Sequence, residues 1–212
     1  MHIPDGFLPP QVCLAGYALT GGVTWYSLSQ IKRDRYIQAN IPKASLLTAA
    51  FFVASLIHIP LPPTSVHLML NGLMGAVLGF YAFPAILIGL FFQAVMFQHG
   101  GMSTLGINAI ILGVPALAAY HVFRQREHLT SKKQIFTKLL SFAAGAGALL
   151  LSATMFAVLL LTHISAELNV SAERTAIIIS LSGYLIQALI EGAFSMMLIS
   201  FLDQVKPELL KS

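Results

Sequence analysis

The sequence predicts an all-α integral membrane protein, a bundle of seven transmembrane helices that forms a single domain over residues 1–212. Composition is the first observation behind this prediction. Residues of the AVILMFWYC class make up 57% of the chain, and Asp, Glu, Lys and Arg only 9%, whereas a typical soluble chain carries about 25% charged residues. The second observation is a mean hydropathy of +0.79. A chain this poor in charge cannot cover a water-facing surface, so we expect the bilayer to be its solvent.

The third observation is a series of seven apolar stretches. A spanning helix needs roughly 20 mostly apolar residues, and shorter helices suffice where protein neighbours shield them. Helix-breaking residues separate several of the stretches, namely Pro60, Pro62 and Pro63, then Pro84, then Gly100 and Gly101. The chain shows no internal repeat. The expected spans are residues 11–30, 44–60, 66–81, 83–98, 105–123, 137–162 and 175–201.

The basic residues predict the orientation of these spans. With the N-terminus outside, seven spans place eleven of the 12 Lys and Arg residues on the inner side and only Arg174 outside, as the positive-inside rule requires. We therefore expect the N-terminus outside and the C-terminus inside the plasma membrane. No Lys or Arg precedes Lys32, so the front of the chain lacks the positive region of a cleaved signal peptide, and we expect Met1 to be retained.

Several functions are excluded by what the sequence lacks. The single cysteine, Cys13, excludes an internal disulfide framework and a multi-thiolate metal site. Nucleic-acid binding is not expected, because no basic patch with interleaved aromatic residues is present. The chain has neither a GxxxxGK[ST] phosphate loop nor a GxSxG nucleophile elbow, so we expect neither ATP hydrolysis nor serine-hydrolase activity, and no enzyme.

His2 places three nitrogen donors within reach of one metal ion. They are the α-amine of Met1, the backbone amide nitrogen of residue 2 and the His2 imidazole, and together they close two small fused chelate rings. Nitrogen donors in a plane suit Ni(II) or Cu(II), and imidazole is acceptable to Co(II) as well. Three donors leave a fourth position open, which an imidazole at the same membrane face would fill.

Two histidines, His58 and His67, bracket the turn HIPLPPTSVH, which the predicted topology places outside, beside the N-terminus. His67 stands at the mouth of the third expected span. Asn71 follows one turn deeper at i+4, where its amide could orient the imidazole or cap the leader. For His58 the alternative role is an imidazole at the headgroup interface. The remaining helix-end histidines, for which interfacial contacts are expected, are His121, His128 and His163.

A second outer segment, QHGGMSTLGIN at residues 98–108, combines paired glycines with polar side chains. Glycines let backbone segments approach closely, so one interpretation is a re-entrant loop that closes over the site; the other is a polar turn. Glu191 is the single carboxylate inside an expected span. Burial of a carboxylate in lipid costs free energy, so Glu191 is expected to have a specific role. The role is either functional, in proton coupling or in a contact between subunits, or structural, as a pair with Gln187 at i−4.

Three segments together resemble the CbiM/NikM family, the substrate-binding subunits of energy-coupling-factor (ECF) transporters for cobalt and nickel. They are the opening MHIPDGFL, the stretch TSVHLMLNGLMGAVLG and the loop HGGMSTLGIN. The resemblance implies a metal site outside the membrane, formed by the Met1 amine, the amide nitrogen and side chain of His2, and the His67 imidazole. It also implies supporting positions, at which side chains would orient those ligands: Asp5, Ser65, Asn71, His99 and Asn108.

The function expected from these observations is that of the substrate-specificity subunit of an ECF-type importer that captures Ni(II) or Co(II) as its substrate, with no cofactor. The partners implied by the resemblance are two cytoplasmic ATPase subunits, a transmembrane T subunit and, in some systems, a small accessory membrane protein. The alternative is a self-sufficient secondary permease or channel for divalent metal. Such a protein would show inverted repeats or interrupted helices near the midplane.

Overall fold

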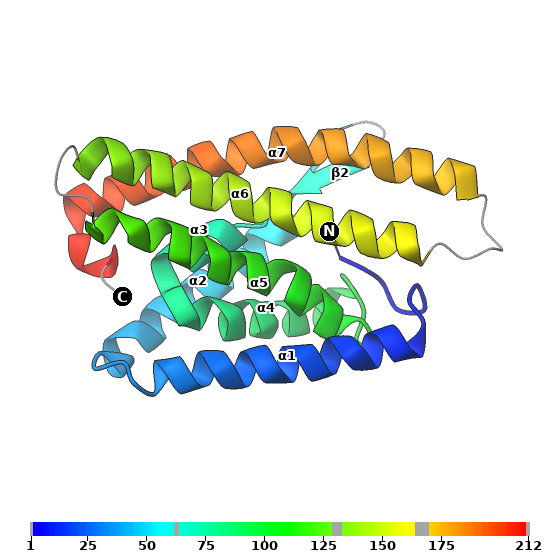
Figure 1. The fold of residues 1–212 in the computed structure, drawn as a ribbon, viewed down its shortest axis with the longest axis horizontal. Helices are drawn as coiled ribbons and strands as arrows, with labels where there is room; N and C mark the ends of the chain where they lie inside the picture. The colour runs from blue at the N-terminus through cyan, green and yellow to red at the C-terminus, as the bar shows by residue number, and fades with distance from the viewer. Residues whose placement is uncertain (1, 62–63, 129–132, 164–169, 211–212) are drawn as a thin grey trace.

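The computed structural model describes residues 2–61, 64–128, 133–163 and 170–210. Long helices lie roughly side by side, with one short β-hairpin among them (Figure 1). The α-helices are α1 (Pro10–Ile31), α2 (Ile37–Leu56), α3 (Asn71–Leu78), α4 (Ala82–Phe97), α5 (Leu105–Arg124), α6 (Lys133–Thr162) and α7 (Val170–Val205). The hairpin pairs β1 (His58–Leu61) with β2 (Thr64–His67), and three 3-10 turns are η1 (Gly79–Tyr81), η2 (Gln125–His128) and η3 (Pro207–Leu210).

The prediction of seven transmembrane helices is wrong. The expected third span, 66–81, begins as strand β2 and becomes helical only at Asn71, and α3 is eight residues long. Eight residues rise about 12 Å, far less than a hydrocarbon core of about 30 Å. At η1, where Gly79 adopts φ +58°, the chain reverses from α3 into α4, so that His67 before α3 and His99 after α4 lie together. Asn71–Phe97 is nevertheless one uninterrupted run of helical residues. The described residues thus hold six long helical segments.

Five of these six segments are long and apolar enough to cross a membrane: Ile37–Leu56, Asn71–Phe97, Leu105–His128, Gln134–Thr162 and Ile177–Val205. The first predicted span, residues 11–30, is not among them. Its helix, α1, is long enough with 22 residues, but Thr20, Thr24 and Ser27 lower its hydropathy. The prediction that the two termini lie on opposite sides of the membrane depended on an odd number of spans, namely seven. The structure removes that argument.

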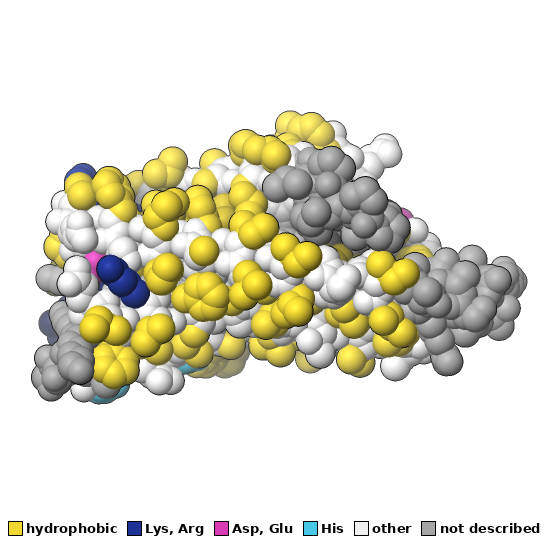
Figure 2. Space-filling view, turned by 90° about the horizontal axis from the view of Figure 1, so that it is seen from above, with side chains coloured by type: hydrophobic (Ala, Val, Ile, Leu, Met, Phe, Trp, Pro, Cys, Tyr) yellow, Lys and Arg dark blue, Asp and Glu magenta, His cyan; other side chains and the backbone are white. Residues whose placement is uncertain are grey.

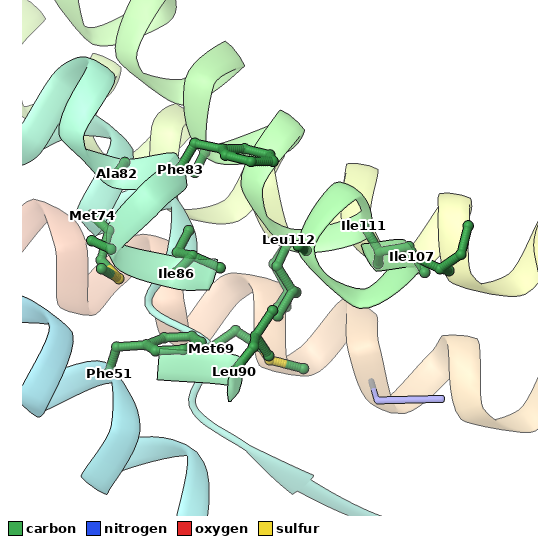
Figure 3. Close-up of a cluster of buried hydrophobic side chains, with 14 of the residues drawn as sticks. Phe51, Met69, Met74, Ala82, Phe83, Ile86, Leu90, Ile107, Ile111 and Leu112 are labelled. Atoms are coloured by element: carbon green, nitrogen blue, oxygen red, sulfur yellow. The ribbon is translucent and has the colours of Figure 1, made fainter. Parts of the chain in front are cut away.

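The short helix α3 lies at the centre of the bundle, since all eight of its residues are buried. It packs against α5 and α6, and α6 in turn packs along α7. Apolar side chains from α2, α4 and α5 complete the core around Met69 and Met74 (Figure 3). The residues labelled there are Phe51, Met69, Met74, Ala82, Phe83, Ile86, Leu90, Ile107, Ile111 and Leu112.

The outer surface has the character expected of a lipid-facing bundle. Large apolar side chains remain exposed on the outer helices, for example Trp25 on α1, Leu46 on α2 and Met197 on α7. Figure 2 shows such side chains along one whole face, with the visible Lys and Arg side chains at the left end. At the same end Lys43 and Arg126 donate hydrogen bonds to the carbonyls of Leu209 and Leu210, which fixes η3.

Close helix packing at α3 depends on the absence of side chains. A Cβ at Gly75 would lie 1.9 Å from the Ala116 carbonyl oxygen of α5, and one at Gly72 would lie 2.3 Å from the Ala144 carbonyl oxygen of α6. Both obstacles are backbone atoms, which cannot rotate away. Gly72 and Gly75 therefore lie at close contacts of α3 with α6 and α5.

We expect Gly75→Ala to destabilise the bundle by about 1–3 kcal/mol, because an overpacked core forces the backbone apart. The matched control is Gly147→Ala on α6, where a Cβ would meet no atom within 4 Å. There, loss of a helical glycine is expected to stabilise by up to about 1 kcal/mol. Thermal unfolding in detergent measures both variants. Equal unfolding temperatures for the two would show that the α3–α5 contact does not limit stability.

Candidate metal centre

The N-terminal leader, residues 2–9, reaches into the bundle ahead of α1 and is held there by two polar side chains of the α5 region. Asn108 accepts a hydrogen bond from the Ile3 N–H (2.9 Å) and donates one to the Ile3 carbonyl (3.1 Å). Thr104 Oγ1 donates a second hydrogen bond to the same carbonyl (2.6 Å). The Ile3 side chain is fully buried in the core. The backbone next to His2 is therefore fixed by Asn108 and Thr104.

Asp5 ties the leader to the loop after α4. Its carboxylate accepts hydrogen bonds from the backbone N–H groups of Met102 (3.1 Å) and Ser103 (2.7 Å), and from the Ser103 hydroxyl (2.5 Å). The hydrogen bonds from Ser103 hold the pKa of Asp5 below its ordinary value. Gly101 is packed against Asp5 so closely that a Cβ would lie 2.3 Å from its Oδ1. The paired glycines thus allow the loop to close over the leader, as the first interpretation of residues 98–108 predicted.

His67 is positioned from the opposite side, by α7. The residue ends β2 in register with His58, and it is only 5% exposed. Gln187 Nε2 donates a hydrogen bond to the His67 carbonyl (2.5 Å). Just beyond, the backbone N–H groups of Met69 (2.5 Å) and Leu70 (3.0 Å) donate to the two carboxylate oxygens of Glu191. The segment that carries His67 is therefore fastened to one face of α7.

This network answers the question that the sequence left open for Glu191. The carboxylate is 1% exposed and accepts a hydrogen bond from Gln187 Nε2 (3.1 Å), the i−4 pair considered as its structural role. With the Met69 and Leu70 N–H groups, it has three donors. Glu191 therefore serves as the anchor of the chain segment between β2 and α3.

The leader, the hairpin and the loop after α4 bring three imidazoles together. Ring centroids are 5.3 Å apart for His2 and His67, 4.3 Å for His2 and His99, and 5.3 Å for His67 and His99. One nitrogen from each ring lies within 4.8 Å of the others. Nitrogens bound to a common ion at about 2.0–2.1 Å are at most about 4.2 Å apart. A shift of less than about 1 Å would bring the rings to coordination distance.

The cluster is electrostatically suited to a cation with nitrogen ligands. Burial, and then the neighbouring rings of His99 and His67, lower the pKa of His2 well below its ordinary value. His2 is therefore neutral near pH 7, which is the form that binds metal. Among the described residues no carboxylate belongs to the cluster. Neutral imidazoles favour Ni(II), Co(II), Cu(II) or Zn(II) over the hard cations Mg(II) and Ca(II).

The other predicted site residues have different positions. Met1 lies outside the described residues, as do the side chains of Ser65 and His58. The Asn71 amide donates to two groups of the core, the Leu112 carbonyl (3.1 Å) and Ser152 Oγ (2.9 Å). Its carbonyl oxygen accepts from the Gly72 N–H (3.0 Å), at the start of α3. Its role is therefore in the core.

The interfacial histidines lie away from the cluster. The His163 ring contacts the Leu159 carbonyl at the end of α6 (2.9 Å), and the His121 ring packs on Phe80 and Tyr120. Sequence reasoning missed Gln93 on α4, which is fully buried, hydrogen-bonded to Ser55 (2.5 Å) and close enough to His2 to raise the pKa of that imidazole slightly. A glutamine inside an apolar span was the available signal.

Comparison with known sequences identifies the family. The profile of CbiM, the cobalt uptake substrate-specific transmembrane region, matches residues 2–209. The chain belongs to the CbiM family. A putative cobalt transport protein, CbiM 1 of Methanocorpusculum labreanum, is 30% identical over 223 residues, covering 100% of this chain and 92% of that protein. The resemblance seen in the sequence motifs is confirmed, and the family consists of cobalt and nickel transport membrane proteins, not enzymes.

Two further relatives match over shorter stretches. A putative metal transport protein of Haemophilus influenzae is 40% identical over 126 residues, 59% of each chain. The fused nickel transport protein NikMN of Rhodobacter capsulatus is 33% identical over 165 residues, 74% of this chain and 47% of that protein. The chain thus spans about half to three fifths of these two relatives. The crystal structure of a truncated transition metal transporter shares the fold, with a TM-score of 0.76, 21% identity and coverage of 96% and 99%.

We expect Asn108→Ala to weaken Ni(II) binding by about 10–100-fold, as is typical when a residue that orients a ligand is lost. The change leaves the Ile3 N–H without Asn108 as its acceptor and frees the backbone beside His2. Asn40→Ala is the matched control, because that amide bonds Asp34 between α1 and α2, away from the histidines. Calorimetric titration with Ni(II) compares them. Unchanged affinity in Asn108→Ala would mean that Asn108 does not position His2.

Proposed function

We propose that this chain is the substrate-specificity subunit of an ECF-type importer and captures Ni(II) or Co(II) from outside the membrane. The ligands are the Met1 amine, the amide nitrogen and imidazole of His2, and the His67 imidazole. The observation that carries the proposal is the convergence of His2 and His67, which the hairpin and the leader bring to a centroid distance of 5.3 Å. Four nitrogen donors in a plane suit Ni(II).

His99 is given a supporting position, beside the plane of the four donors. Its ring is tilted by 56° to that of His2 and by 75° to that of His67. One nitrogen of His99 lies within 4.8 Å of a nitrogen of His2 and a nitrogen of His67. The experiments below therefore also test a second arrangement of ligands. In that arrangement the three imidazoles alone hold the ion, and the Met1 amine is not needed.

The charge distribution supports capture from outside. Apart from Arg174 near the start of α7, the described Lys and Arg residues gather where α1, α5 and α7 end and where α2 and α6 begin, on the side of η3. The leader lies toward the opposite ends of α1 and α5 (Figure 1), and its His2 belongs to the cluster of three imidazoles. Basic ends of membrane helices face the cytoplasm, so the metal centre faces out of the cell across the plasma membrane.

The partners follow from the energy that uptake needs. The sequence has no phosphate-binding loop for ATP, so two ATPase subunits and a transmembrane T subunit would supply hydrolysis and coupling, with a small accessory membrane protein in some systems. The relative from Rhodobacter capsulatus is named as a fused nickel transport protein NikMN, and this chain matches only 47% of it. This supports a separate protein partner here in place of the fused remainder. The alternative, a self-sufficient permease or channel, would use Glu191 to couple protons. The three hydrogen bonds to that carboxylate favour an anchoring role instead.

We expect His67→Ala to lower Ni(II) affinity by more than about 100-fold, the upper limit for residues that only orient ligands. His163→Ala should bind normally, because its ring lies at the end of α6. Calorimetry gives the affinities. Metal uptake is then measured in vesicles holding the chain with its ATPase and T partners, and in vesicles holding the chain alone. Uptake by the chain alone without ATP would favour the permease, and equal affinities of the two variants would refute the ligand assignment.

A single residue added before Met1 tests the amine as a ligand. The former amine becomes an amide, the chelate rings around His2 change size, and the leader alone can then surround a metal, which excludes His67. We expect ATP-driven uptake to fail even where some metal binding survives. His99→Ala in the natural chain is the companion variant and should retain Ni(II) more tightly than His67→Ala. Normal uptake by the extended chain, together with loss of binding in His99→Ala, would establish the three-imidazole site.

A further inference from the structure

A long apolar groove runs between α1 and α2 and is floored by α4. Its cavity volume is about 660 Å³, within the range of ligand pockets. In the most apolar stretch of α2 only 11% of the residues are buried, whereas 72% are buried in that of Asn71–Phe97. The reason is that α2 packs on α4 along one side only. The groove walls include Leu28 on α1, Ile41 and Ala49 on α2, and Ile88 and Phe92 on α4.

A second, polar cavity of about 310 Å³ adjoins the groove at the basic end of the bundle. Ile31 and Tyr81 line both cavities, so the two are immediate neighbours. The polar cavity is lined by three cations, Arg33, Arg35 and Lys43, and by one carboxylate, Asp34. Arg33 and Arg35 are exposed, and neither forms an ion pair with a described residue. An anion would find two cations available there.

The length and lining of the groove suit a hydrocarbon chain. It extends along α2 from Ile37 to Phe52, a rise of about 22 Å at 1.5 Å per residue. The side chains that line this length are mainly apolar, so the part of an occupant that lies there is apolar as well.

We propose that the two cavities form a binding site for one anionic phospholipid, with an acyl chain in the groove and the phosphate beside Arg33 and Arg35. Basic pockets between helices on the cytoplasmic side are suited to anionic headgroups, which the inner leaflet supplies. The site lies at the end of the bundle away from the three imidazoles and does not depend on metal binding.

Asp34 does not oppose this assignment. Its carboxylate oxygens are occupied by three donors: the Tyr36 N–H (2.8 Å), the Asn40 amide (2.7 Å) and the Tyr81 hydroxyl (2.8 Å). Lys43 donates to the Leu209 carbonyl and stays beside Asp34. Asp34 and Lys43 balance each other in charge, which leaves the net positive charge of the cavity on Arg33 and Arg35.

The experiment uses the delipidated full chain in detergent, titrated with dipalmitoyl phosphatidylglycerol, dipalmitoyl phosphatidylcholine or inorganic phosphate and examined by native mass spectrometry. We expect one phosphatidylglycerol per chain, weaker binding of phosphatidylcholine and none of free phosphate. Arg33→Gln combined with Arg35→Gln should weaken phosphatidylglycerol binding by about 25-fold, roughly fivefold for each cation lost. Lys32→Gln is the matched control, because that exposed cation does not line the cavity.

A second pair of variants tests the groove itself. Ala49→Phe narrows it and should abolish the stoichiometric lipid, whereas Ala50→Phe, one residue on and outside the lining, should not. Both positions are exposed, so both variants are expected to fold, which unfolding temperatures verify. Equal affinity for the two lipids would overturn the proposal, as would equal losses in the Lys32 and the double-Arg variants. So would tight binding of free phosphate, or a dimer of the chain that Ala49→Phe disrupts.

Discussion

The pairing of one side-chain amide with the backbone of one leader residue is the constraint on which the candidate metal centre depends. Asn108 bonds both peptide groups of Ile3, its N–H and its carbonyl, as a neighbouring β-strand would. Peptide groups buried among helices need such partners, because no water is present to replace them. The pairing also fixes the register of the leader. A slip of one residue would bring a different side chain against His67, so Asn108 determines that the imidazole in the cluster is the one next to the N-terminus.

The His99 and His67 imidazoles are held by separate anchors, one of which belongs to the leader itself. The loop that carries His99 is fastened by Asp5, a leader residue, through Met102 and Ser103. The segment that carries His67 is fastened by α7 instead. Two anchors on separate elements thus hold one nitrogen from each of the three rings within 4.8 Å of the others. Side chains that are already held close together lose little conformational freedom when they bind a ligand, which favours tight binding.

Adjacency along the chain made part of the centre predictable from sequence. His2 and His67 were both selected from the sequence, and their rings lie together in the structure. The chelate that the Met1 amine would complete with His2 stays a prediction. The roles of Asn71 and Asn108 could not be separated, because an i+4 spacing shows which residues share a face but not what packs on it. Hydropathy likewise gave seven spans. An apolar stretch that begins as the end of a strand and continues as a short buried helix can have the same mean hydropathy as a spanning helix, and only the packing of α3 distinguishes them.

Glu191 shows most clearly why local pattern was insufficient. Its spacing from Gln187 predicted their contact, but the peptide groups that they hold are about 120 residues away. Those groups lie where the chain leaves β2 and enters α3, and Leu70 adopts φ +50° there. A helix that starts inside the protein has N–H groups without intrahelical partners, and lipid provides none. A carboxylate with two acceptor oxygens satisfies the Met69 and Leu70 N–H groups and lies at the positive end of the α3 dipole. The short central helix and the segment that carries His67 therefore share one support on α7. The buried carboxylate, which is expensive in a membrane, joins the candidate metal centre to the core.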